Sequence, residues 1–580
     1  MRRRFFSKII NKVPSTPSTP STIDINNYMT VEAMEDGVVI QFPSELSYSI
    51  DLDNNWSTLA ANTPVTINSG QTISFKASLT PVTDTGSGTF TITGGACRLL
   101  GNCMSLLFGD NAATSVDLSA HNSAFMELFL NCTTIVSVAE NFLPATTLSP
   151  RCYQSIFSGC TSLTDMPILS AETLPAYCYK YMFLGCSSLV TAKAIGAVTM
   201  GSQCCESMFQ NCTSLVTAPT LSSVTSTADY SYYRMFLGCT KLTTAPKITA
   251  KTLGTYACSE MFKNCTSLVT APSIAATTVG TYSCYYMFQG CTKLKTPPSK
   301  LPATTLASRC YARMFYNCSV MTKAPTLSAT TLGTYCYEYM FNGCSKLTTA
   351  PVLKATTLAN YCYRYMFNGC SALKSMPDLP AKTLKSSCYY AMFQKCTSLT
   401  EISLSNVQGV APSCCRYMFS GCTGLQTAYC PVATTLSNNC YQQMFNACSN
   451  LSYISMCATD ISATNCLTNW VNGVASTGTF VKDASMTSLP TGVNGIPSGW
   501  IAKNYIVFYI NSNAYMEPLI YGAEEGMTWG EWLDSGYHNG KWRISSTPTP
   551  TNGYIYDPQG ALDENTPIIS GYTYYTGYEY

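Results

Sequence analysis

The chain has 580 residues, of which 11% are charged, and its net charge is +2. This length suggests several domains, and so small a net charge offers no extended positive field, which argues against a dedicated nucleic-acid-binding protein. No apolar run approaches the roughly 20 residues needed to cross a bilayer, so we expect no membrane-spanning segment.

Residues 1–23 are predicted to form a basic arm and a tether. Three arginines follow Met1, and a Pro/Ser/Thr-rich stretch begins at Pro14. Polar residues interrupt the apolar segment that a signal peptide requires, so we do not expect secretion by that route. The arm is either a docking element on a semi-rigid Pro-rich tether or a disordered terminus.

Residues 24–95 are predicted to form a small β-sandwich-like domain that caps the array after it. Short β-prone segments separated by turn residues support this prediction. The segments are 29–33, 38–42, 63–67, 72–76 and 89–93.

An aromatic and cysteine pattern that returns every 26 or 27 residues dominates the middle of the chain. Its phenylalanines are Phe157, Phe183, Phe209, Phe236, Phe262, Phe288, Phe315, Phe341, Phe367, Phe393, Phe419 and Phe445. Met precedes every one except Phe157, and a cysteine follows each by three positions, as Cys186, Cys344 and Cys370 do. Such a period is typical of a solenoid in which these Phe and Cys residues form the core between stacked units.

One unit, residues 347–370, is predicted to contain a short strand that bends at Pro351 and a short helix. With 100° per residue, four apolar residues fall on one face of that helix. They are Tyr363, Met366, Phe367 and Cys370. Gly369 suits the turn that ends the helix, and strands of successive units would stack about 4.8 Å apart in a parallel sheet.

The 31 cysteines are predicted to form buried, reduced ladders. Free cysteine behaves as a small hydrophobe, and two cysteines eight residues apart on a helix lie about 12 Å apart, beyond the reach of a disulfide. The sequence contains no C-x-x-C, and its histidines are His121 and His538. We therefore expect no structural metal, and we assign no cofactor.

The end of the array and the C-terminal region differ in pattern. Trp470 stands about one period after Phe445 but lacks the Met-Phe pair, which predicts an end cap and a solenoid that spans residues 96–500. Residues 501–580 are predicted to be a small β-rich module, with a strand at 505–510 and a short helix at 529–533. Its aromatic residues are assigned to its core in preference to a binding surface.

The repeated Leu-x-x-Ala-Pro and Cys-Tyr-x-x-Met-Phe-x-Gly/Asn-Cys-x-x-Leu blocks resemble the BspA-like, or treponemal-type, leucine-rich repeat over about 400 residues. The chain differs in its Met-Phe pair, where many members have Ala-Phe, and in its frequent Ala-Pro. Together with the periodicity and the flanking β-prone segments, the resemblance predicts an α/β solenoid, a leucine-rich repeat array of about twelve regular 26–27-residue coils, flanked by small β-rich N- and C-terminal domains. It also implies surface recognition and adhesion.

The whole arrangement resembles, less specifically, proteins encoded by tailed bacteriophages of gut Bacteroidales. That resemblance implies a virion protein of the tail or fibre, assembled in the bacterial cytoplasm. Its partners would be a glycan or protein of the host cell surface and, through the N-terminal region, other virion proteins. A BspA-type adhesin on the bacterial cell surface and an intracellular interaction scaffold are the alternatives, and the oligomeric state stays open.

Catalysis is not expected. The common nucleophile, nucleotide and metalloprotease motifs are absent from the sequence. Four carboxylates could support glycoside hydrolysis, which needs only two, but solvated loop residues are the preferred interpretation. They are Asp534, Asp557, Asp563 and Glu564.

A candidate ligand-binding surface lies two positions before each Phe, on the side of the predicted helix opposite the core. Its tyrosines are Tyr181, Tyr286, Tyr339, Tyr365 and Tyr417. They could stack on sugars or dock a protein, although exposed decoration or contact with the next coil is favoured. A second column on the sheet is attributed to cross-strand packing. It comprises Thr191, Thr217, Thr244, Thr270, Thr296 and Thr349.

Overall fold

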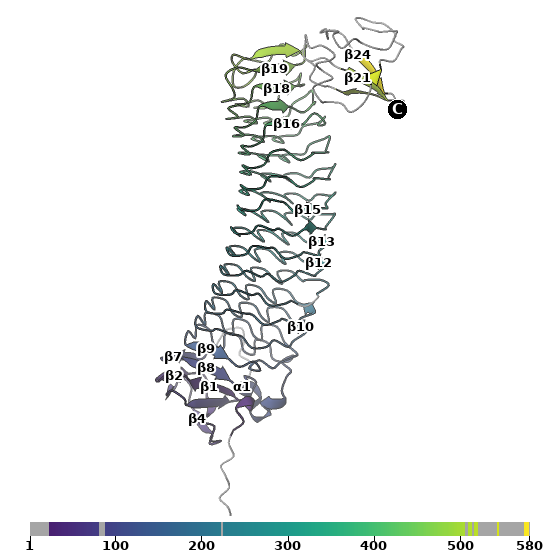
Figure 1. Cartoon of the computed structure of the whole chain (residues 1–580). Helices are drawn as coiled ribbons and strands as arrows, with labels where there is room; N and C mark the ends of the chain where they lie inside the picture. The colour runs from purple at the N-terminus through teal and green to yellow at the C-terminus, as the bar shows by residue number, and fades with distance from the viewer. Residues whose placement is uncertain are drawn as a thin grey trace, which may run out of the picture.

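The computed structural model describes residues 23–79, 88–221 and 224–504, and the backbone of four strands between residues 508 and 578. A long stack of coils rises from a β-rich N-terminal module (Figure 1). Within the described residues, the regular elements are short strands, one α-helix and two 3-10 helices. The N-terminal ones are η1 Ile25–Asn27, β1 Met29–Ala33, β2 Val38–Gln41, β3 Leu46–Ile50, β4 Ser57–Leu59, β5 Val65–Ile67, β6 Thr72–Lys76, β7 Thr91–Thr93, β8 Cys97–Leu100, α1 Ser105–Phe108 and η2 Gly109–Thr114.

The strands of the coils are very short. They are β9 Ile135–Val138, β10 Thr173–Leu174, β11 Thr199–Met200, β12 Thr252–Leu253, β13 Thr278–Val279, β14 Lys300–Leu301, β15 Thr326–Leu327, β16 Glu401–Ser403, β17 Thr427–Tyr429, β18 Tyr453–Met456, β19 Thr479–Lys482 and β20 Ile501–Asn504. The remaining strands are β21 Phe508–Ser512, β22 Tyr515–Leu519, β23 Trp542–Arg543 and β24 Tyr574–Tyr578, in the order β22-β21-β24-β23. The helix expected at 529–533 lies outside the described residues.

Two sheets build the N-terminal module. A six-stranded sheet has the order β4-β3-β6-β1-β8-β9, and a three-stranded sheet has the order β5-β2-β7. Strands β1 and β6 have the predicted bounds, and β2, β5 and β7 fall within the predicted segments, whereas β3 and β4 were not predicted. Pairing in this module is antiparallel except between β8 and β9, which run parallel. This parallel pair joins the module to the first coils.

The coils stack in parallel register, which confirms the predicted solenoid. Thr173 pairs with Thr199, Thr252 with Thr278, and β16 to β20 form a five-stranded parallel sheet. Elsewhere a single bridge replaces a strand pair, as between Lys323 and Thr349. Neighbouring coils are therefore related by a shift of one repeat.

The segment around each Phe is not helical, so the short helix predicted for each unit is wrong. Consecutive four-residue turns replace it, and Tyr361, Tyr365 and Gly369 have φ values of +58°, +55° and +74°. The N–H of Tyr365 donates to Tyr390 in the next coil at 2.9 Å, whereas the N–H of Met366 donates three residues back within its own coil at 3.0 Å. Gly369 accordingly supplies a left-handed turn residue and ends no helix.

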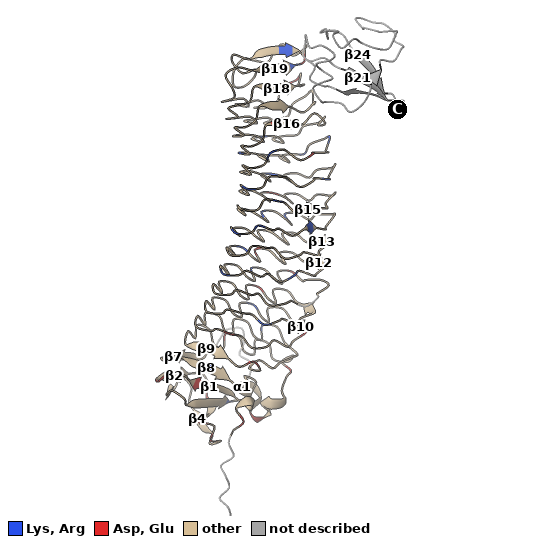
Figure 2. Cartoon of the chain, viewed as in Figure 1, with Lys and Arg blue, Asp and Glu red and all other residues tan. Residues whose placement is uncertain are grey.

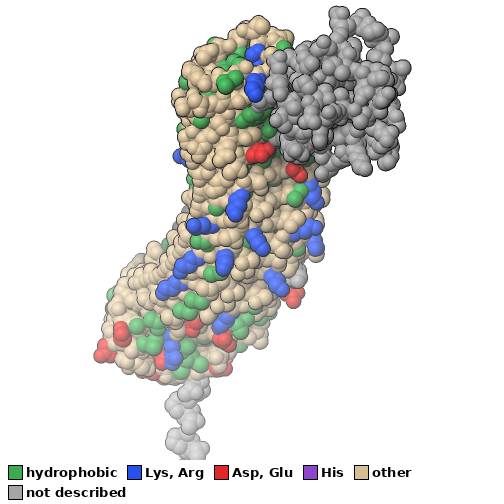
Figure 3. All heavy atoms as spheres, turned by 45° about the horizontal axis from the view of Figure 1, so that its top comes forward, with side chains coloured by type: hydrophobic (Ala, Val, Ile, Leu, Met, Phe, Trp, Pro, Cys, Tyr) green, Lys and Arg blue, Asp and Glu red, His purple; other side chains and the backbone are tan. Residues whose placement is uncertain are grey.

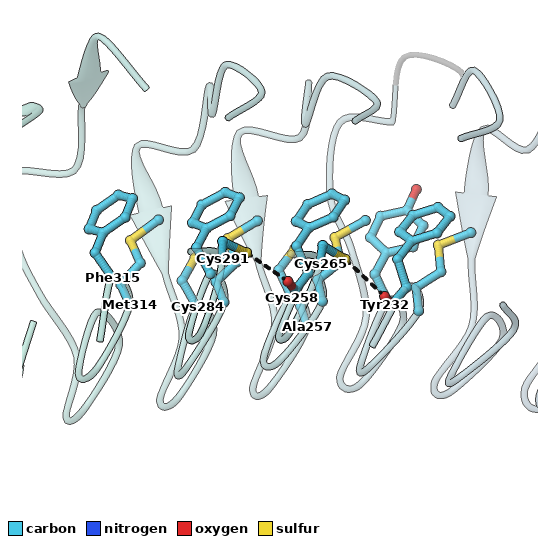
Figure 4. Packing of buried hydrophobic residues seen from close by; sticks show 14 of the residues in the cluster. Tyr232, Ala257, Cys258, Cys265, Cys284, Cys291, Met314 and Phe315 are labelled. Atoms are coloured by element: carbon cyan, nitrogen blue, oxygen red, sulfur yellow. Dashed lines mark hydrogen bonds between the residues drawn. The ribbon is translucent and has the colours of Figure 1, made fainter. Parts of the chain in front are cut away.

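The phenylalanines of the repeat form one continuous buried stack. From Phe157 to Phe445, ring centroids of successive coils lie 5.4–5.9 Å apart with nearly parallel planes. Every Phe in the stack, and likewise Cys186, Cys344 and Cys370, is completely buried. Figure 4 shows the same arrangement repeated around Cys265 and Cys291. This stack is the axis of the hydrophobic core.

All 31 cysteines are buried as free thiols. In twelve successive coils the thiol three residues after Phe donates to the carbonyl of the Phe in the preceding coil, at 3.0–3.2 Å. Burial raises the pKa of the Cys291 thiol to about 12. The thiols therefore stay protonated and serve as small core groups that satisfy a carbonyl.

The far end of the array is closed by tryptophans. Trp470 is fully buried against Phe445, with ring centroids 5.9 Å apart, and its Nε1–H donates to the carbonyl of Gly495 at 2.9 Å. The Nε1–H of Trp500 donates to the carbonyl of Ala475 at 2.7 Å. A large ring thus covers the last Phe and finds a partner for its polar atom.

Candidate interaction surface

The turns that replace the predicted helix place the residues two and six positions before each Phe on one outer face of the solenoid. Tyrosine and arginine side chains there are partly exposed, whereas small residues such as Ser207 and Ala391 are buried. In both positions the backbone is left-handed, as at Tyr335 and Tyr339 with φ of +59° and +55°. The residues between them, Cys336 and Tyr337, are buried. Side chains on one outer face therefore repeat in register from coil to coil.

The five predicted tyrosines all lie on this face and are half-buried. They do not form one uninterrupted row. Tyr181 and Tyr417 lie toward the two ends, and the coils that separate them from the other three carry other residue types at this position. The middle ones belong to a first ladder, which consists of Tyr286, Arg313, Tyr339 and Tyr365 in four successive coils. The guanidinium of Arg313 lies 5.1 Å from the ring centroid of Tyr286 and 4.6 Å from that of Tyr339. The rings of Tyr339 and Tyr365 stack at 4.5 Å.

A second ladder runs beside the first, six residues before each Phe, and sequence analysis missed it. It consists of Tyr230, Tyr256, Tyr282, Arg309, Tyr335 and Tyr361 in six successive coils. Centroid distances between its stacked tyrosines are 4.4–4.8 Å. Arg309 lies between Tyr282 and Tyr335, at 5.5 and 4.2 Å from their centroids. The repeat register contained the signal, since these residues share one spacing from Phe.

Three buried glutamates hold three further cations of this face in place, which are not members of the two ladders. Lys180 pairs with Glu206 at 3.1 Å, Arg234 with Glu260 at 3.2 Å, and Arg364 with Glu338 at 3.0 Å. Each of the three glutamates is less than 9% exposed to solvent. Burial raises the pKa of Glu338, and the nearby Arg364 opposes that rise. The pairs fix the charged groups without leaving a buried carboxylate unpaired.

We call the two ladders and their cations the ladder face. Its ring faces are covered by neighbouring rings and guanidinium groups, so an approaching partner meets ring edges, phenol hydroxyls and Arg or Lys groups. Flat stacking of a sugar on Tyr339 or Tyr365 would have to displace the neighbour. The observed arrangement matches the favoured expectation of contact with the next coil, and it offers polar, hydrogen-bonding recognition.

The other residues weighed in the sequence lie elsewhere. All six threonines of the second column are exposed on the sheet side, and Thr191, Thr217 and Thr244 form parallel bridges in series. Within the described ranges, no group of three or more His, Cys, Asp or Glu residues could hold a metal. The four carboxylates considered for glycoside hydrolysis, at 534, 557, 563 and 564, lie outside those ranges. Among the described helices, none is long and apolar enough to span a membrane.

Stacked parallel coils with a repeated apolar register define the class of leucine-rich repeat solenoids. Residues 108–468, more than half of the chain, match the BspA type leucine-rich repeat region in overlapping segments, namely 108–243, 207–348, 273–391 and 363–468. The chain belongs to the BspA-type leucine-rich repeat family.

Solved structures with a related arrangement are distant. A leucine-rich repeat protein from Bacteroides ovatus is 18% identical with a TM-score of 0.30, and the match covers 55% of this chain and 85% of that one. A leucine-rich cell surface protein from Faecalibacterium prausnitzii is 16% identical with a TM-score of 0.27, covering 57% and 75%. A leucine-rich repeat protein from Eubacterium ventriosum is 12% identical with a TM-score of 0.22, covering 71% and 95%. No curated protein matches the chain.

Proposed function

We propose that this chain is a non-enzymatic recognition protein that binds a cell-surface partner through the ladder face. The observation that supports this most directly is the alignment of tyrosines and arginines across six successive coils, where stacking has already fixed the rings and guanidinium groups. A preorganised surface loses little side-chain entropy when a partner binds. Tyr and Arg are also the residues enriched at binding hot spots.

The proposal fits the family to which the chain belongs, since the BspA-type resemblance implied surface recognition and adhesion. An adhesin on the bacterial cell surface is the simplest form of it. In this proposal residues 96–500 present the binding face, residues 24–95 cap it, and residues 1–23 tether the whole. We assign residues 501–580 to a β-rich module whose first strand, β20, pairs with β19 in the solenoid sheet.

A second form of the proposal places the protein in a phage tail or fibre, where it would contact the host surface. One observation favours it: all 31 cysteines are buried free thiols. Protein thiols persist in a reducing compartment such as the bacterial cytoplasm, where virions assemble. The weaker resemblance to phage proteins of gut Bacteroidales points the same way.

Binding is tested with the labelled full-length chain and washed cells from its source culture. The Arg309→Ala/Arg313→Ala variant removes the cation from both ladders and should lose most binding. Lys247→Ala/Lys354→Ala removes the same charge from exposed positions outside the ladder face and should bind like the parent. Equal binding by all three proteins would reject the ladder face as the recognition surface.

Location is tested separately by an immunoblot across a density gradient of culture lysate. Comigration with particles that contain DNA and capsid protein supports the virion form. Recovery on washed cells supports the adhesin, and recovery in soluble cytosol alone would reject both in favour of an intracellular scaffold.

A further inference from the structure

Charge is strongly segregated along the chain, although its net charge is only +2. From Arg234 to Lys395 there are 18 lysines and arginines against three acidic residues, a net charge of +15. Residues 24–229 carry five basic and 16 acidic residues. Figures 2 and 3 show Lys and Arg spread over the middle of the solenoid and most Asp and Glu near its N-terminal end. The middle coils therefore present a local positive field that the overall charge conceals.

Part of this charge forms a line along one side of the solenoid. We define the lysine stripe as the lysines five to eight positions after Phe in the coils that begin at Phe236 to Phe367. They are Lys241, Lys293, Lys295, Lys323, Lys346 and Lys374, and all six are exposed. The residue six positions after Phe is buried in each coil, as Leu294 and Leu347 are, so the positions before and after it face outward together.

Register between the coils aligns the stripe, which is interrupted at the Phe262 coil, where residues 267–270 include no lysine. The N–H of Lys295 donates to the carbonyl of Val269 in the preceding coil at 2.9 Å, and Lys323 forms a bridge with Thr349 in the next. Equivalent residues of adjacent coils thus lie about 4.8 Å apart. In the described part of the chain no ion pair engages a stripe lysine. The ammonium groups are therefore available to a partner.

The residues around the stripe distinguish between partner classes. Exposed threonines line it, among them Thr244, Thr270 and Thr296, and they add hydroxyl groups in the same register. Within this five-to-eight window of the six coils there is no acidic, aromatic or arginine residue. Single-stranded nucleic acid is usually held by aromatic stacking platforms and phosphate by arginine forks, and the stripe lacks both. Lysine ammonium and threonine hydroxyl groups suit carboxylates and sugar hydroxyls.

We propose that the lysine stripe is a binding site for an extended anionic polysaccharide that carries carboxylates, lying along the solenoid axis. The coil spacing is comparable to the length of one pyranose unit, so successive uronate units would meet successive coils, and each coil except that of Phe262 would offer at least one lysine. This site is separate from the ladder face, and it gives the protein a second, charge-driven contact.

The test uses the full-length chain and polygalacturonate, with its fully methyl-esterified form as the neutral control of identical backbone. The stripe variant is Lys293→Gln/Lys323→Gln/Lys346→Gln/Lys374→Gln. Its charge-matched control is Lys247→Gln/Lys300→Gln/Lys354→Gln/Lys382→Gln, four exposed lysines outside the stripe. Thermal unfolding of both variants is measured first, because exposed substitutions should leave it unchanged.

We expect the parent to bind polygalacturonate but not the ester, and the affinity to fall steeply with salt as counterions are released. The stripe variant should bind roughly tenfold more weakly or worse, and the control within about threefold of the parent. Equal losses in both variants would show that only net charge matters and would overturn the proposal. Tighter binding of a single-stranded oligonucleotide of equal charge would overturn it in favour of nucleic acid.

The outcome is independent of the ladder face. Cell binding that depends on Arg309 and Arg313, without polygalacturonate binding, would overturn the stripe alone. If the chain binds polygalacturonate but does not bind cells, the result would support the lysine stripe as a polysaccharide site and reject the proposed recognition function.

Discussion

At the scale of single residues, the cysteine after each Phe explains why the core tolerates so many sulfur atoms. Its thiol fills a small apolar space and also donates to the Phe carbonyl of the preceding coil. That carbonyl already accepts the backbone N–H of the cysteine in its own coil. The carbonyl of Phe341, for example, accepts the N–H of Cys344 at 3.0 Å and the thiol of Cys370 at 3.2 Å. Serine would bring a more strongly hydrated group, and alanine would leave that second bond unmade. Cysteine meets both requirements.

The thiols predict a loss of stability at alkaline pH. In the unfolded chain a cysteine ionises near pH 8.5, whereas burial raises the pKa of Cys284 and Cys291 in the folded protein to about 12. Above about pH 8.5 the unfolded state therefore binds fewer protons than the native state, and the free energy of unfolding falls as pH rises toward 12. Below pH 8.5 the stabilisation is fully present.

Urea unfolding at pH 7, 9 and 10 measures this effect. The midpoint should fall steadily with pH, and a Cys284→Ala/Cys291→Ala variant should show a shallower fall than the parent. A midpoint that stays constant to pH 10 would contradict the assignment of these thiols to a dry core.

Phe341 predicts the cost of breaking the ring stack. Its ring lies 5.6 Å from those of both Phe315 and Phe367, so Phe341→Ala should lower the free energy of unfolding by roughly 3–5 kcal/mol through the cavity that it leaves. Chemical denaturation provides the measurement. Unchanged unfolding would contradict the burial of this ring.

Tyr365→Ala is the matched comparison on the outside. Tyr365 stacks on Tyr339 but is half-exposed, so its loss should cost about 1 kcal/mol. A loss as large as that of Phe341 would show that the ladder face belongs to the core.

At the scale of elements, the turn stack depends on residues that accept a left-handed backbone. Position two after Phe is usually Gly or Asn, and Gly343 and Gly369 both have φ of +74°. A Cβ at Gly369 would meet nothing closer than a backbone nitrogen of Gly343 at 3.7 Å, whereas a Cβ at Gly343 would collide with Oδ1 of Asn317. The two sites therefore differ in contact but not in conformation.

Alanine at each of these glycines separates strain from collision. Gly369→Ala should cost about 1 kcal/mol, the strain of a left-handed residue, and Gly343→Ala should cost more. Denaturation of the two variants gives the difference, and Asn317→Ala in the Gly343→Ala background should remove it. Equal costs without that substitution would refute the predicted collision.

The turn stack also shows what the sequence could and could not predict. Buried residues at Tyr363, Met366, Phe367 and Cys370 fit a helical face, but four-residue turns produce the same spacing, so periodicity alone could not separate them. Gly369 fitted a helix end equally well. The discriminating feature was the left-handed backbone at Tyr361 and Tyr365, and tyrosine gives no sequence signal for that conformation.

The N-terminal strands were predicted more successfully because alternation and turn residues mark them directly. Strands β1 and β6 have the predicted bounds. In the candidate site, register revealed the column of Tyr339 and Tyr365, but the stacking that covers their ring faces depends on how neighbouring coils meet. That contact is absent from any single repeat.

At the scale of the whole molecule, the array is long rather than compact. Adjacent coils advance by about 4.8 Å, so the twelve regular ones span roughly 58 Å. The N-terminal module and the last coils lengthen the molecule further at the two ends (Figure 1). A compact 580-residue protein would have a radius of gyration of about 25 Å. Small-angle X-ray scattering of the full chain should give a clearly larger value and a skewed distance distribution, and a value near 25 Å would reject the extended solenoid.

Whole-molecule averages were also where the sequence was least informative. A net charge of +2 argued against an extended positive field, yet the middle coils alone carry +15. The segregation of charge is visible in the sequence itself once the charges are counted separately for each repeat.

The alternation of backbone hydrogen bonds, one within a coil and the next between coils, has a consequence for inheritance. Each coil offers its successor the same donors, acceptors and ring stack that it accepts from its predecessor. A recombination event that inserts or deletes 26 codons would therefore leave a foldable protein with one row more or fewer. Descendant genes can therefore encode a longer or shorter solenoid that keeps the same pattern of surface side chains.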